Sequence, residues 1–233
     1  MAAPIAVAID APDIETAARW ASEVSPHVST VKVGLELYLR YGPEVVGTLR
    51  GGNRTSVFLD LKLHDIPATV AGAVRNLARF KPSILTVHAA GGREMVRAAV
   101  DAAPRTSIAA VTILTSLDDA SLNDIGMSGP VSDATRRLAV MAVEAGAAAL
   151  VCSPHEVPAL RAEVGPDVTL ITPGVRPLGS DHGDQARVAT PEAAYEAGAD
   201  LLVIGRPITR ASDPGAAAAS IAAALRRVET PPV

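Results

Sequence analysis

Short apolar runs alternate with helix-like segments along the whole of this 233-residue chain. The runs, read as strands, cover residues 5–10, 30–34, 57–62, 84–88, 108–112, 149–153, 169–172 and 201–205. The intervening segments, read as helices, cover residues 13–25, 37–49, 67–80, 93–102, 133–145, 154–163, 191–197 and 214–228. Regular strand–helix alternation makes the strands parallel, and eight units predict an α/β fold of the (β/α)₈ TIM-barrel type, with eight parallel strands ringed by helices. A doubly wound open sheet is the alternative, but no Gly-x-Gly-x-x-Gly turn follows the first run.

The length, charge and composition of the chain indicate its domain organisation, its possible partners and its location. We expect one barrel domain over residues 1–229 and a frayed tail at 230–233. A net charge of −4 and a pI near 5.7 give no reason to expect a nucleic acid or an anionic membrane as partner. The N-terminus lacks the features of a signal peptide, and no apolar stretch approaches the ~18 residues of a membrane helix. A single cysteine, Cys152, excludes an intrachain disulfide. We therefore expect a cytoplasmic protein.

The densest group of charges follows the third apolar run, in the decapeptide of residues 60–69. Residues two apart in a strand point to the same face, so Asp60 and Lys62 should emerge side by side. Asp65 follows in the turn before the next helix. Charges at the end of a buried strand cost several kcal/mol unless they are paired, so we interpret this group as a catalytic site. The alternative interpretation is an Asp–Lys pair that merely closes one end of the barrel.

A metal site is another interpretation of the same decapeptide, because His64 lies between Lys62 and Asp65. Asp60 and Asp65 would then share the ligand set with His64. Lys32, at the end of the second apolar run, and Lys62 would both repel a cation bound there. We therefore expect no metal.

The last two strand–helix units carry the signals of a phosphate site. Barrels often bind a phosphate between the loops that follow strands seven and eight, using backbone N–H groups and a helix N-terminus. Those loops contain Arg176 and the pair Gly205-Arg206, which supply guanidinium groups and an approachable backbone. The loop from residue 174 to about residue 190 is long for a barrel connection and is interpreted as a lid. Gln185 within it is a candidate ligand contact. The alternative interpretation is two ordinary surface arginines.

These residues together resemble one enzyme family over essentially the whole chain. The chain is similar to the orotidine 5′-phosphate decarboxylases, in their bacterial form. The motifs that carry the resemblance are Asp60-x-Lys62-x-x-Asp65-Ile66-Pro67-x-Thr69, Val7-x-x-Asp10, Lys32-Val33-Gly34, Leu114-Thr115-Ser116, Thr172-Pro173-Gly174-Val175-Arg176, Asp184-Gln185 and Ile204-Gly205-Arg206.

The resemblance implies cofactor-independent removal of CO₂ from orotidine 5′-phosphate, which yields uridine 5′-phosphate in de novo pyrimidine biosynthesis, with no metal. It implies that Lys62 protonates the carbon that loses the carboxylate and that Asp60 lies against the departing group. Whether Asp60 stresses the substrate or orders the lysines stays open. Lys32 and Asp65 would complete the charge network, with Asp65 supplied by the neighbouring subunit of a homodimer.

The resemblance also assigns the residues that bind the nucleotide. Asp10, Lys32 and Thr69 would contact the ribose, and Thr115 would lie beside the pyrimidine. The phosphate would be held by Arg176, Gln185, Gly205 and Arg206.

Two other functions stay open from the residues. A Mg-dependent sugar-phosphate decarboxylase or aldolase of the same barrel superfamily shares the Asp-x-Lys-x-x-Asp strand, although the Ile66-Pro67-x-Thr69 continuation argues against it. A non-catalytic nucleotide-binding barrel is the second, and the presence of both Asp60 and Lys62 argues against that.

Overall fold

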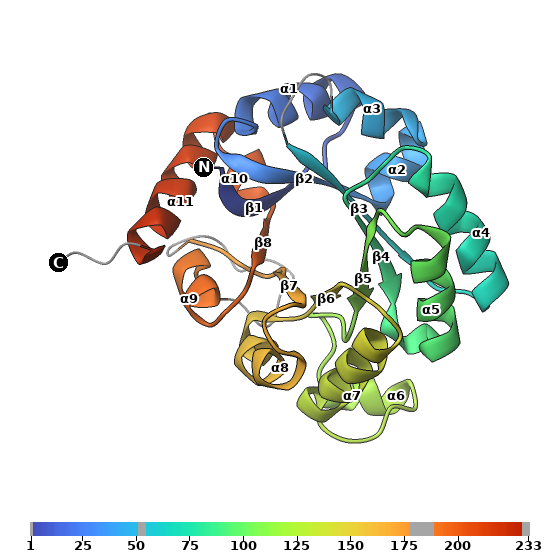
Figure 1. The fold of residues 1–233 in the computed structure, drawn as a ribbon. Helices are drawn as coiled ribbons and strands as arrows, with labels where there is room; N and C mark the ends of the chain where they lie inside the picture. The colour runs from blue at the N-terminus through green and yellow to red at the C-terminus, as the bar shows by residue number, and fades with distance from the viewer. Residues whose placement is uncertain (1, 51–54, 178–188, 230–233) are drawn as a thin grey trace.

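Eight parallel strands form a closed barrel in the computed structural model, which describes residues 2–50, 55–177 and 189–229. Each strand is hydrogen-bonded to the next in chain order, and β1 also pairs with β8, so the sheet has no free edge. The strands are β1 (Ala3–Ala8), β2 (Val28–Gly34), β3 (Ser56–Leu63), β4 (Ile84–His88), β5 (Ser107–Val111), β6 (Ala149–Val151), β7 (Thr169–Thr172) and β8 (Leu201–Ile204). The predicted (β/α)₈ barrel is confirmed, and the open-sheet alternative is wrong. Figure 1 shows the strands at the centre of a ring of helices.

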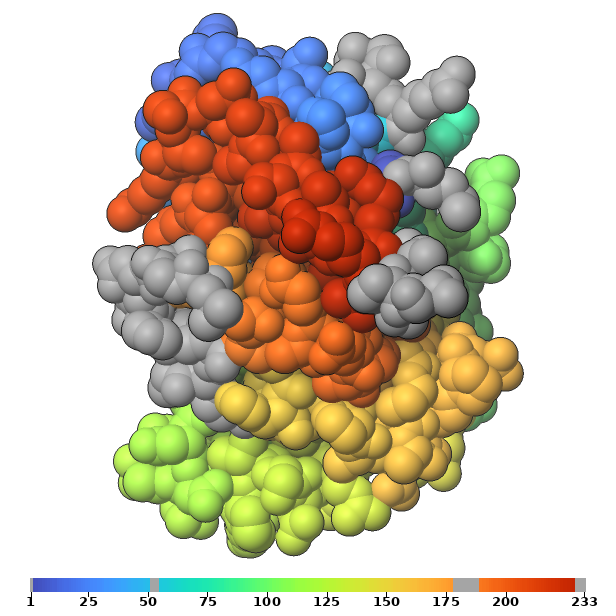
Figure 2. Space-filling view, turned by 90° about the vertical axis from the view of Figure 1, so that its left-hand side faces the viewer, coloured from blue at the N-terminus to red at the C-terminus, as the bar shows by residue number. Residues whose placement is uncertain are grey.

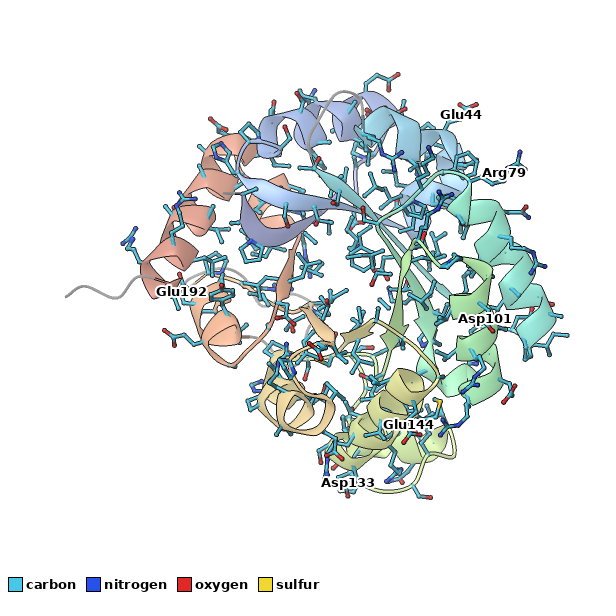
Figure 3. The ribbon with its side chains drawn as sticks, viewed as in Figure 1. Glu44, Arg79, Asp101, Asp133, Glu144 and Glu192 are labelled. Carbon is cyan, nitrogen blue, oxygen red and sulfur yellow. The ribbon has the colours of Figure 1, made fainter. Side chains whose placement is uncertain are left out.

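The helices of the ring follow the strands in the order that the sequence predicts. They are α1 (Ile14–Val24), α2 (Leu35–Tyr41), α3 (Glu44–Arg50), α4 (Pro67–Ala78), α5 (Arg93–Ala102), α6 (Asp119–Asp124), α7 (Val131–Glu144), α8 (Val157–Val164), α9 (Pro191–Glu196), α10 (Arg206–Thr209) and α11 (Pro214–Glu229). In Figure 2, α11 and α9 lie side by side on one flank of the barrel. The charged side chains labelled in Figure 3 lie on these helices, or directly after α4 in the case of Arg79, and point away from the barrel axis.

The prediction of a single helix over residues 37–49 is wrong. Residues 37–49 form parts of two helices, α2 and α3, which are separated by Gly42 and Pro43. Gly42 adopts a φ of 63°, in the left-handed region, and its N–H donates to the Tyr38 carbonyl to end α2. Pro43 lacks an N–H and restricts the residue before it, so the helical repeat cannot pass through. The short helices α6 and α10 are absent from the prediction.

The core has two layers because alternate residues of each strand face opposite sides of the sheet. On β1, Ile5 and Val7 belong to the large cluster between the sheet and the helices, whereas Ala6 belongs to a smaller cluster. That smaller cluster also contains Phe58 and Ile171 and fills the barrel interior. The barrel is thus a packed core, and a cavity has room only at its ends.

All eight strands point their carboxyl ends to the same rim, and the loops that follow them build the site there. No helix among the described residues is long and apolar enough to cross a membrane. The predicted frayed tail, 230–233, lies outside the described residues.

Candidate active site

A cavity of about 680 Å³ opens at the carboxyl rim of the barrel. Loops and strand ends from both halves of the chain line it, and the apolar side chains of Phe58, Val111 and Val203 form part of its wall. Eight of the predicted site residues line this cavity: Asp10, Lys32, Asp60, Lys62, Thr115, Arg176, Gly205 and Arg206. Residues separated by up to about two hundred positions in the sequence therefore share one space, as the rim of a parallel barrel requires.

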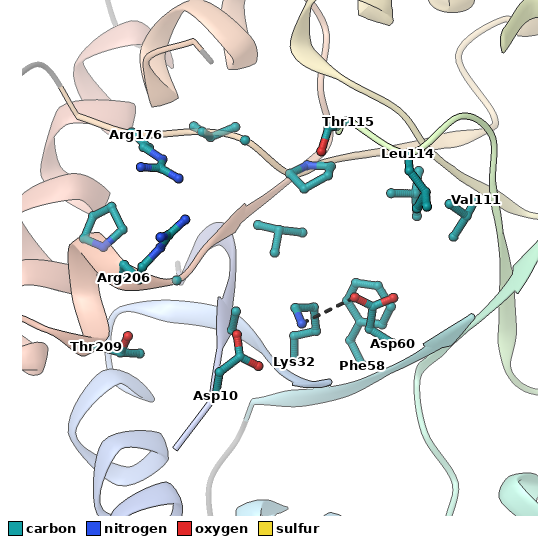
Figure 4. A pocket seen from close by; sticks show the side chains of 18 of the residues that line it. Asp10, Lys32, Phe58, Asp60, Val111, Leu114, Thr115, Arg176, Arg206 and Thr209 are labelled. Atoms are coloured by element: carbon teal, nitrogen blue, oxygen red, sulfur yellow. Dashed lines mark ion pairs between the residues drawn. The ribbon is translucent and has the colours of Figure 1, made fainter. Parts of the chain in front are cut away.

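The centre of the cavity holds one carboxylate between two ammonium groups. Asp60 on β3 pairs with Lys62 at 2.8 Å from Oδ1 to Nζ and with Lys32 on β2 at 3.4 Å from Oδ2 to Nζ. The second pair is the dashed line in Figure 4. The side chains of Asp60 and Lys32 are only 14% and 10% exposed. Each carboxylate oxygen thus faces its own lysine, so the charge of the largely buried Asp60 is balanced on both sides.

The Asp60 carboxyl has a lowered pKa although it is largely buried. Desolvation acts to raise the pKa of this carboxyl, but the ammonium groups of Lys32 and Lys62, with hydrogen bonds from Lys62 and Thr86, outweigh it and lower the pKa below its usual value. Asp60 is therefore ionised at neutral pH, and the site presents a fixed negative charge beside two positive ones.

A bulge in β3 brings Lys62 to this position. Leu59 pairs with Leu85 of β4 and Leu63 pairs with Val87, so three residues of β3 span the space of one residue of β4. Lys62 has a φ of 50°, in the left-handed region, which costs a residue with a side chain about 1 kcal/mol or more. Asp60 and Lys62 lie together, as predicted, but the reason is wrong. The bulge brings them together, and regular strand geometry does not.

Gly34 lets two further polar groups approach the same point. A Cβ atom at this position would lie 3.0 Å from Oδ1 of Asp10 and 3.4 Å from Nζ of Lys32. Since the first of these distances is shorter than ordinary van der Waals contact, a side chain here would displace the Asp10 carboxylate. The glycine at the end of β2 therefore permits Asp10 and Lys32 to converge from adjacent strands.

Two arginines lie at another side of the cavity. In Figure 4, Arg176 and Arg206 are close to each other and separate from the Lys32–Asp60 pair. Arg176 follows β7 and is buried, and Arg206 is the first residue of α10 after β8. The Arg176 N–H donates to the Ala189 carbonyl at 2.9 Å, and the Ala189 N–H donates to the Gly174 carbonyl at 3.3 Å. The two ends of the loop between β7 and α9 are thus joined beside the arginines.

Three predicted site residues are not part of this cavity as the structure describes it. Asp65 and Thr69 are exposed and do not line it, although they follow β3 within seven residues of Lys62. The Asp65 carboxylate accepts a hydrogen bond from the Ile66 N–H at 2.6 Å, within its own turn. Gln185 and most of the predicted lid, residues 178–188, lie outside the described residues.

Sequence reasoning missed the threonine that touches both catalytic candidates on β3. Thr86 on β4 is fully buried, and its hydroxyl donates to Oδ1 of Asp60 at 3.1 Å. The Thr86 hydroxyl oxygen also accepts a hydrogen bond from the backbone N–H of Lys62 at 2.9 Å. The only signal in the sequence is a polar residue within an apolar strand, which many buried strands also contain.

Other titratable groups near the cavity fit structural roles. Cys152 lines the cavity but is almost wholly buried, and desolvation raises the pKa of its thiol to about 12, so it is not a nucleophile at neutral pH. His88 is half-buried and lies 5.5 Å from His64 between ring centroids. Burial lowers the pKa of His88 below its usual value. Among the described residues, no three His, Cys, Asp or Glu side chains are grouped so that they could hold a metal ion.

Comparisons with known proteins agree on one family. Residues 3–221 match the orotidine 5′-phosphate decarboxylase / HUMPS family. An orotidine 5′-phosphate decarboxylase of Thermobifida fusca is 73% identical over 232 residues, which cover 100% of both chains. One of Frankia casuarinae is 58% identical, over 96% of this chain and 88% of that one. The crystal structure of orotidine 5′-phosphate decarboxylase from Lactobacillus acidophilus superposes with a TM-score of 0.84 at 36% identity, covering 96% of this chain and 99% of that one.

Proposed function

The chain belongs to the orotidine 5′-phosphate decarboxylase / HUMPS family, and we propose that it is a carboxy-lyase that converts orotidine 5′-phosphate into uridine 5′-phosphate and CO₂. The observation that carries this proposal is the Lys32–Asp60–Lys62 cluster in a cavity that also contains Arg176 and Arg206. The cluster can act on a pyrimidine carboxylate while the arginines bind the phosphate. The product belongs to de novo pyrimidine biosynthesis.

Lys62 is the proposed acid of the reaction. When the bond to the carboxylate breaks, CO₂ leaves and the electron pair stays on the pyrimidine carbon. The Lys62 ammonium stabilises this developing negative charge and then transfers a proton to the carbon, which leaves Lys62 neutral until solvent protonates it again. Because the cavity wall around it is partly apolar, a fixed positive charge acts more strongly there than in water.

Asp60 and Lys32 have the proposed role of holding that acid ready. The carboxylate of Asp60 pairs with both ammonium groups, which supports its function in ordering them before the reaction. A substrate carboxylate placed beside Asp60 would also meet a like charge, which is relieved when CO₂ leaves. Both contributions need an ionised Asp60, and the lowered pKa of this carboxyl supports that state.

The remaining predicted residues are proposed to bind the nucleotide. Asp10 and Lys32, which converge beside Gly34, would contact the ribose, and Thr115 would lie beside the pyrimidine. Arg176, Gly205 and Arg206 would hold the phosphate, with the backbone at the start of α10 helping to bind the anion. Gln185 is proposed as a further phosphate contact. Binding energy at this distant group would lower the barrier at the reacting carbon.

We further propose that the active enzyme is a homodimer whose sites each receive Asp65 and Thr69 from the partner. Both residues are exposed and lie outside the cavity of their own chain. Ile66, between them, is 66% exposed, and Leu39 on α2 is 78% exposed, at the same rim. Exposed apolar side chains next to polar groups that have no role in their own cavity support a docking surface for a second copy.

A cytoplasmic location is also part of the proposal. The only cysteine, Cys152, has no possible partner for an intrachain disulfide, a composition that suits a reducing compartment.

The direct test is the loss of orotidine 5′-phosphate absorbance with purified protein that has been treated with EDTA. We expect full turnover without any added metal. Activity on a ketose phosphate that EDTA abolishes would instead favour the Mg-dependent decarboxylase or aldolase. Tight binding of uridine 5′-phosphate without any turnover would favour the non-catalytic nucleotide-binding barrel. The comparisons favour neither of these alternatives.

Replacing Arg206 with alanine should weaken substrate binding much more than it slows the bound substrate. One lost charge-assisted hydrogen bond to the phosphate predicts a rise in KM of about 10- to 100-fold. Steady-state kinetics on orotidine 5′-phosphate measure this effect. Phosphite dianion should partly restore activity on orotidine, which lacks the phosphate, in the wild-type enzyme and less so in the variant.

The matched control for this prediction is Arg105→Ala. Arg105 is exposed and lies two residues before the start of β5, at the rim opposite the cavity, so this variant removes the same charge without touching the proposed phosphate site. We expect its KM to be unchanged. Equal KM values in the Arg206→Ala and wild-type enzymes would show that the phosphate site has been misplaced.

A further inference from the structure

The bulge in β3 depends on a single side chain from the neighbouring strand. Between the pairs Leu59–Leu85 and Leu63–Val87, the only residue of β4 opposite Asp60, Leu61 and Lys62 is Thr86. In a regular sheet, the Lys62 N–H would donate to a carbonyl of the adjacent strand. Here it donates to the Thr86 hydroxyl at 2.9 Å. A side chain thus takes the place of a backbone partner at the point where the ladder is interrupted.

The hydroxyl of Thr86 has a second bond that reaches the reacting groups. A hydroxyl can accept and donate at the same time, and this one donates to Oδ1 of Asp60 at 3.1 Å. Oδ1 also accepts from the Lys62 ammonium at 2.8 Å. One oxygen atom of Thr86 therefore connects the backbone of Lys62 to the carboxylate that its own side chain contacts.

No water molecule can easily replace the hydrogen bonds of the Thr86 hydroxyl. Its side chain is 0% exposed, so water does not readily replace the hydroxyl. Without it, the Lys62 N–H would lose the partner that the structure gives it, in a residue already held at a φ of 50°. Buried donors that lose their partner are costly, and residues held in unfavourable backbone conformations persist only when their surroundings fix them.

We propose that Thr86 is a positioning residue of the decarboxylation, whose hydroxyl fixes the backbone of Lys62 and the carboxylate of Asp60 in one arrangement. This inference rests on the proposed function of the same site. Thr86 does not line the cavity, so it acts through Asp60 and Lys62 and not on the substrate. The groups that face Asp60 are then Lys32 from β2, Lys62 from β3 and Thr86 from β4.

The test compares Thr86→Val with Thr86→Ser. Valine keeps the shape of threonine and lacks the hydroxyl, whereas serine keeps the hydroxyl. We expect kcat to fall about 10- to 100-fold in the valine variant, with KM changed less than about threefold, because supporting partners of site residues commonly have effects of this size. The serine variant should keep kcat within about threefold of wild type, since it retains both hydrogen bonds.

The pH dependence separates positioning from simple destabilisation. The hydrogen bond from Thr86 helps to lower the pKa of Asp60, so its loss should raise that pKa. The low-pH decline of kcat should therefore move to higher pH in Thr86→Val and not in Thr86→Ser. His88, whose pKa is also perturbed, interacts with His64, Lys62 and Asp60. Protonation of Asp60 would remove a charge that raises the pKa of His88, so His88 would shift in the opposite direction and does not produce this difference.

Thr135→Val is the matched control. Thr135 on α7 is equally buried, and its hydroxyl also contacts a carboxylate, that of Glu156, at 3.4 Å. This variant makes the same chemical change at a residue that does not line the cavity and does not contact Asp60 or Lys62, and we expect unchanged kcat and an unchanged pH profile. Thermal unfolding of every variant reports any general loss of stability.

The kinetic results distinguish a wrong inference about Thr86 from a wrong proposed function. Thr86→Ala is a second hydroxyl-free variant, and it replaces Thr86→Val in the comparison if valine prevents folding. If the hydroxyl-free and serine variants have equal kcat and equal pH profiles, the hydroxyl is not a positioning group and the inference is wrong. A wild-type protein that does not decarboxylate orotidine 5′-phosphate would instead overturn the proposed function, and this is measured first.

Discussion

Lys62→Ala should lose nearly all turnover, by at least about 10³-fold, while it still binds uridine 5′-phosphate. The proton donor is needed for the chemical step, whereas in the proposed function the product is bound through its phosphate by Arg176 and Arg206, which lie away from the Lys32–Asp60 pair. Absorbance assays at high enzyme concentration measure the residual turnover, and calorimetric titration measures the affinity for uridine 5′-phosphate. We expect that affinity to stay within about tenfold of wild type.

Two further variants make this result specific. Lys62→Arg keeps the positive charge but cannot release a proton near neutral pH, so it should be nearly as inactive as Lys62→Ala. Lys81→Ala is the matched control, because Lys62 and Lys81 are the non-glycine residues with positive φ in the described part of the chain, at 50° and 52°. Lys81 is exposed and far from the rim, so this variant should be fully active. If Lys62→Ala retained more than a few per cent of wild-type turnover, another group would have to be the acid.

Mixing inactive Lys62→Ala and Asp65→Ala proteins should recover about a quarter of the wild-type activity. In a hybrid dimer, one site carries both defects and the other combines the Lys62 of one chain with the Asp65 of its partner. Random exchange makes half of the dimers hybrid, so about a quarter of all sites are intact. The two proteins are mixed under mild dissociating conditions and returned to native buffer, with exchange confirmed by mass tags.

Two controls test whether the recovered activity comes from sharing of Asp65 between chains. Asp65→Asn keeps the oxygen that accepts from the Ile66 N–H, so it tests the charge of Asp65 with the turn preserved. Lys62→Ala mixed with Asp60→Ala should recover nothing, because Asp60 and Lys62 line the same cavity of one chain, and every hybrid site then lacks one of them. Activity of the first mixture no higher than the sum of its parents would show that Asp65 serves its own chain's site, although the decarboxylase assignment would stand.

The sequence by itself determined the architecture and most of the cavity lining. Eight apolar runs with helices between them specify parallel strands through local periodicity alone, and parallel strands in a closed barrel bring their carboxyl ends to one rim. Asp10, Lys32 and Arg206 could therefore be assigned to one site although they are far apart in the chain. The helix predicted over residues 37–49 is divided at Gly42 and Pro43, both of which are local signals for the end of a helix.

Only the tertiary structure decided how the catalytic candidates meet. The bulge at Asp60–Lys62 depends on the register between β3 and β4, which is set by contacts with a neighbouring strand and not by the residues of β3. Thr86 could not be assigned from its own strand, because its importance lies in hydrogen bonds to residues about 25 positions earlier. The exposure of Asp65 outside its own cavity does not follow from the local sequence pattern, which predicts only that its side chain follows the strand end; the family resemblance alone implied that it serves the partner's site.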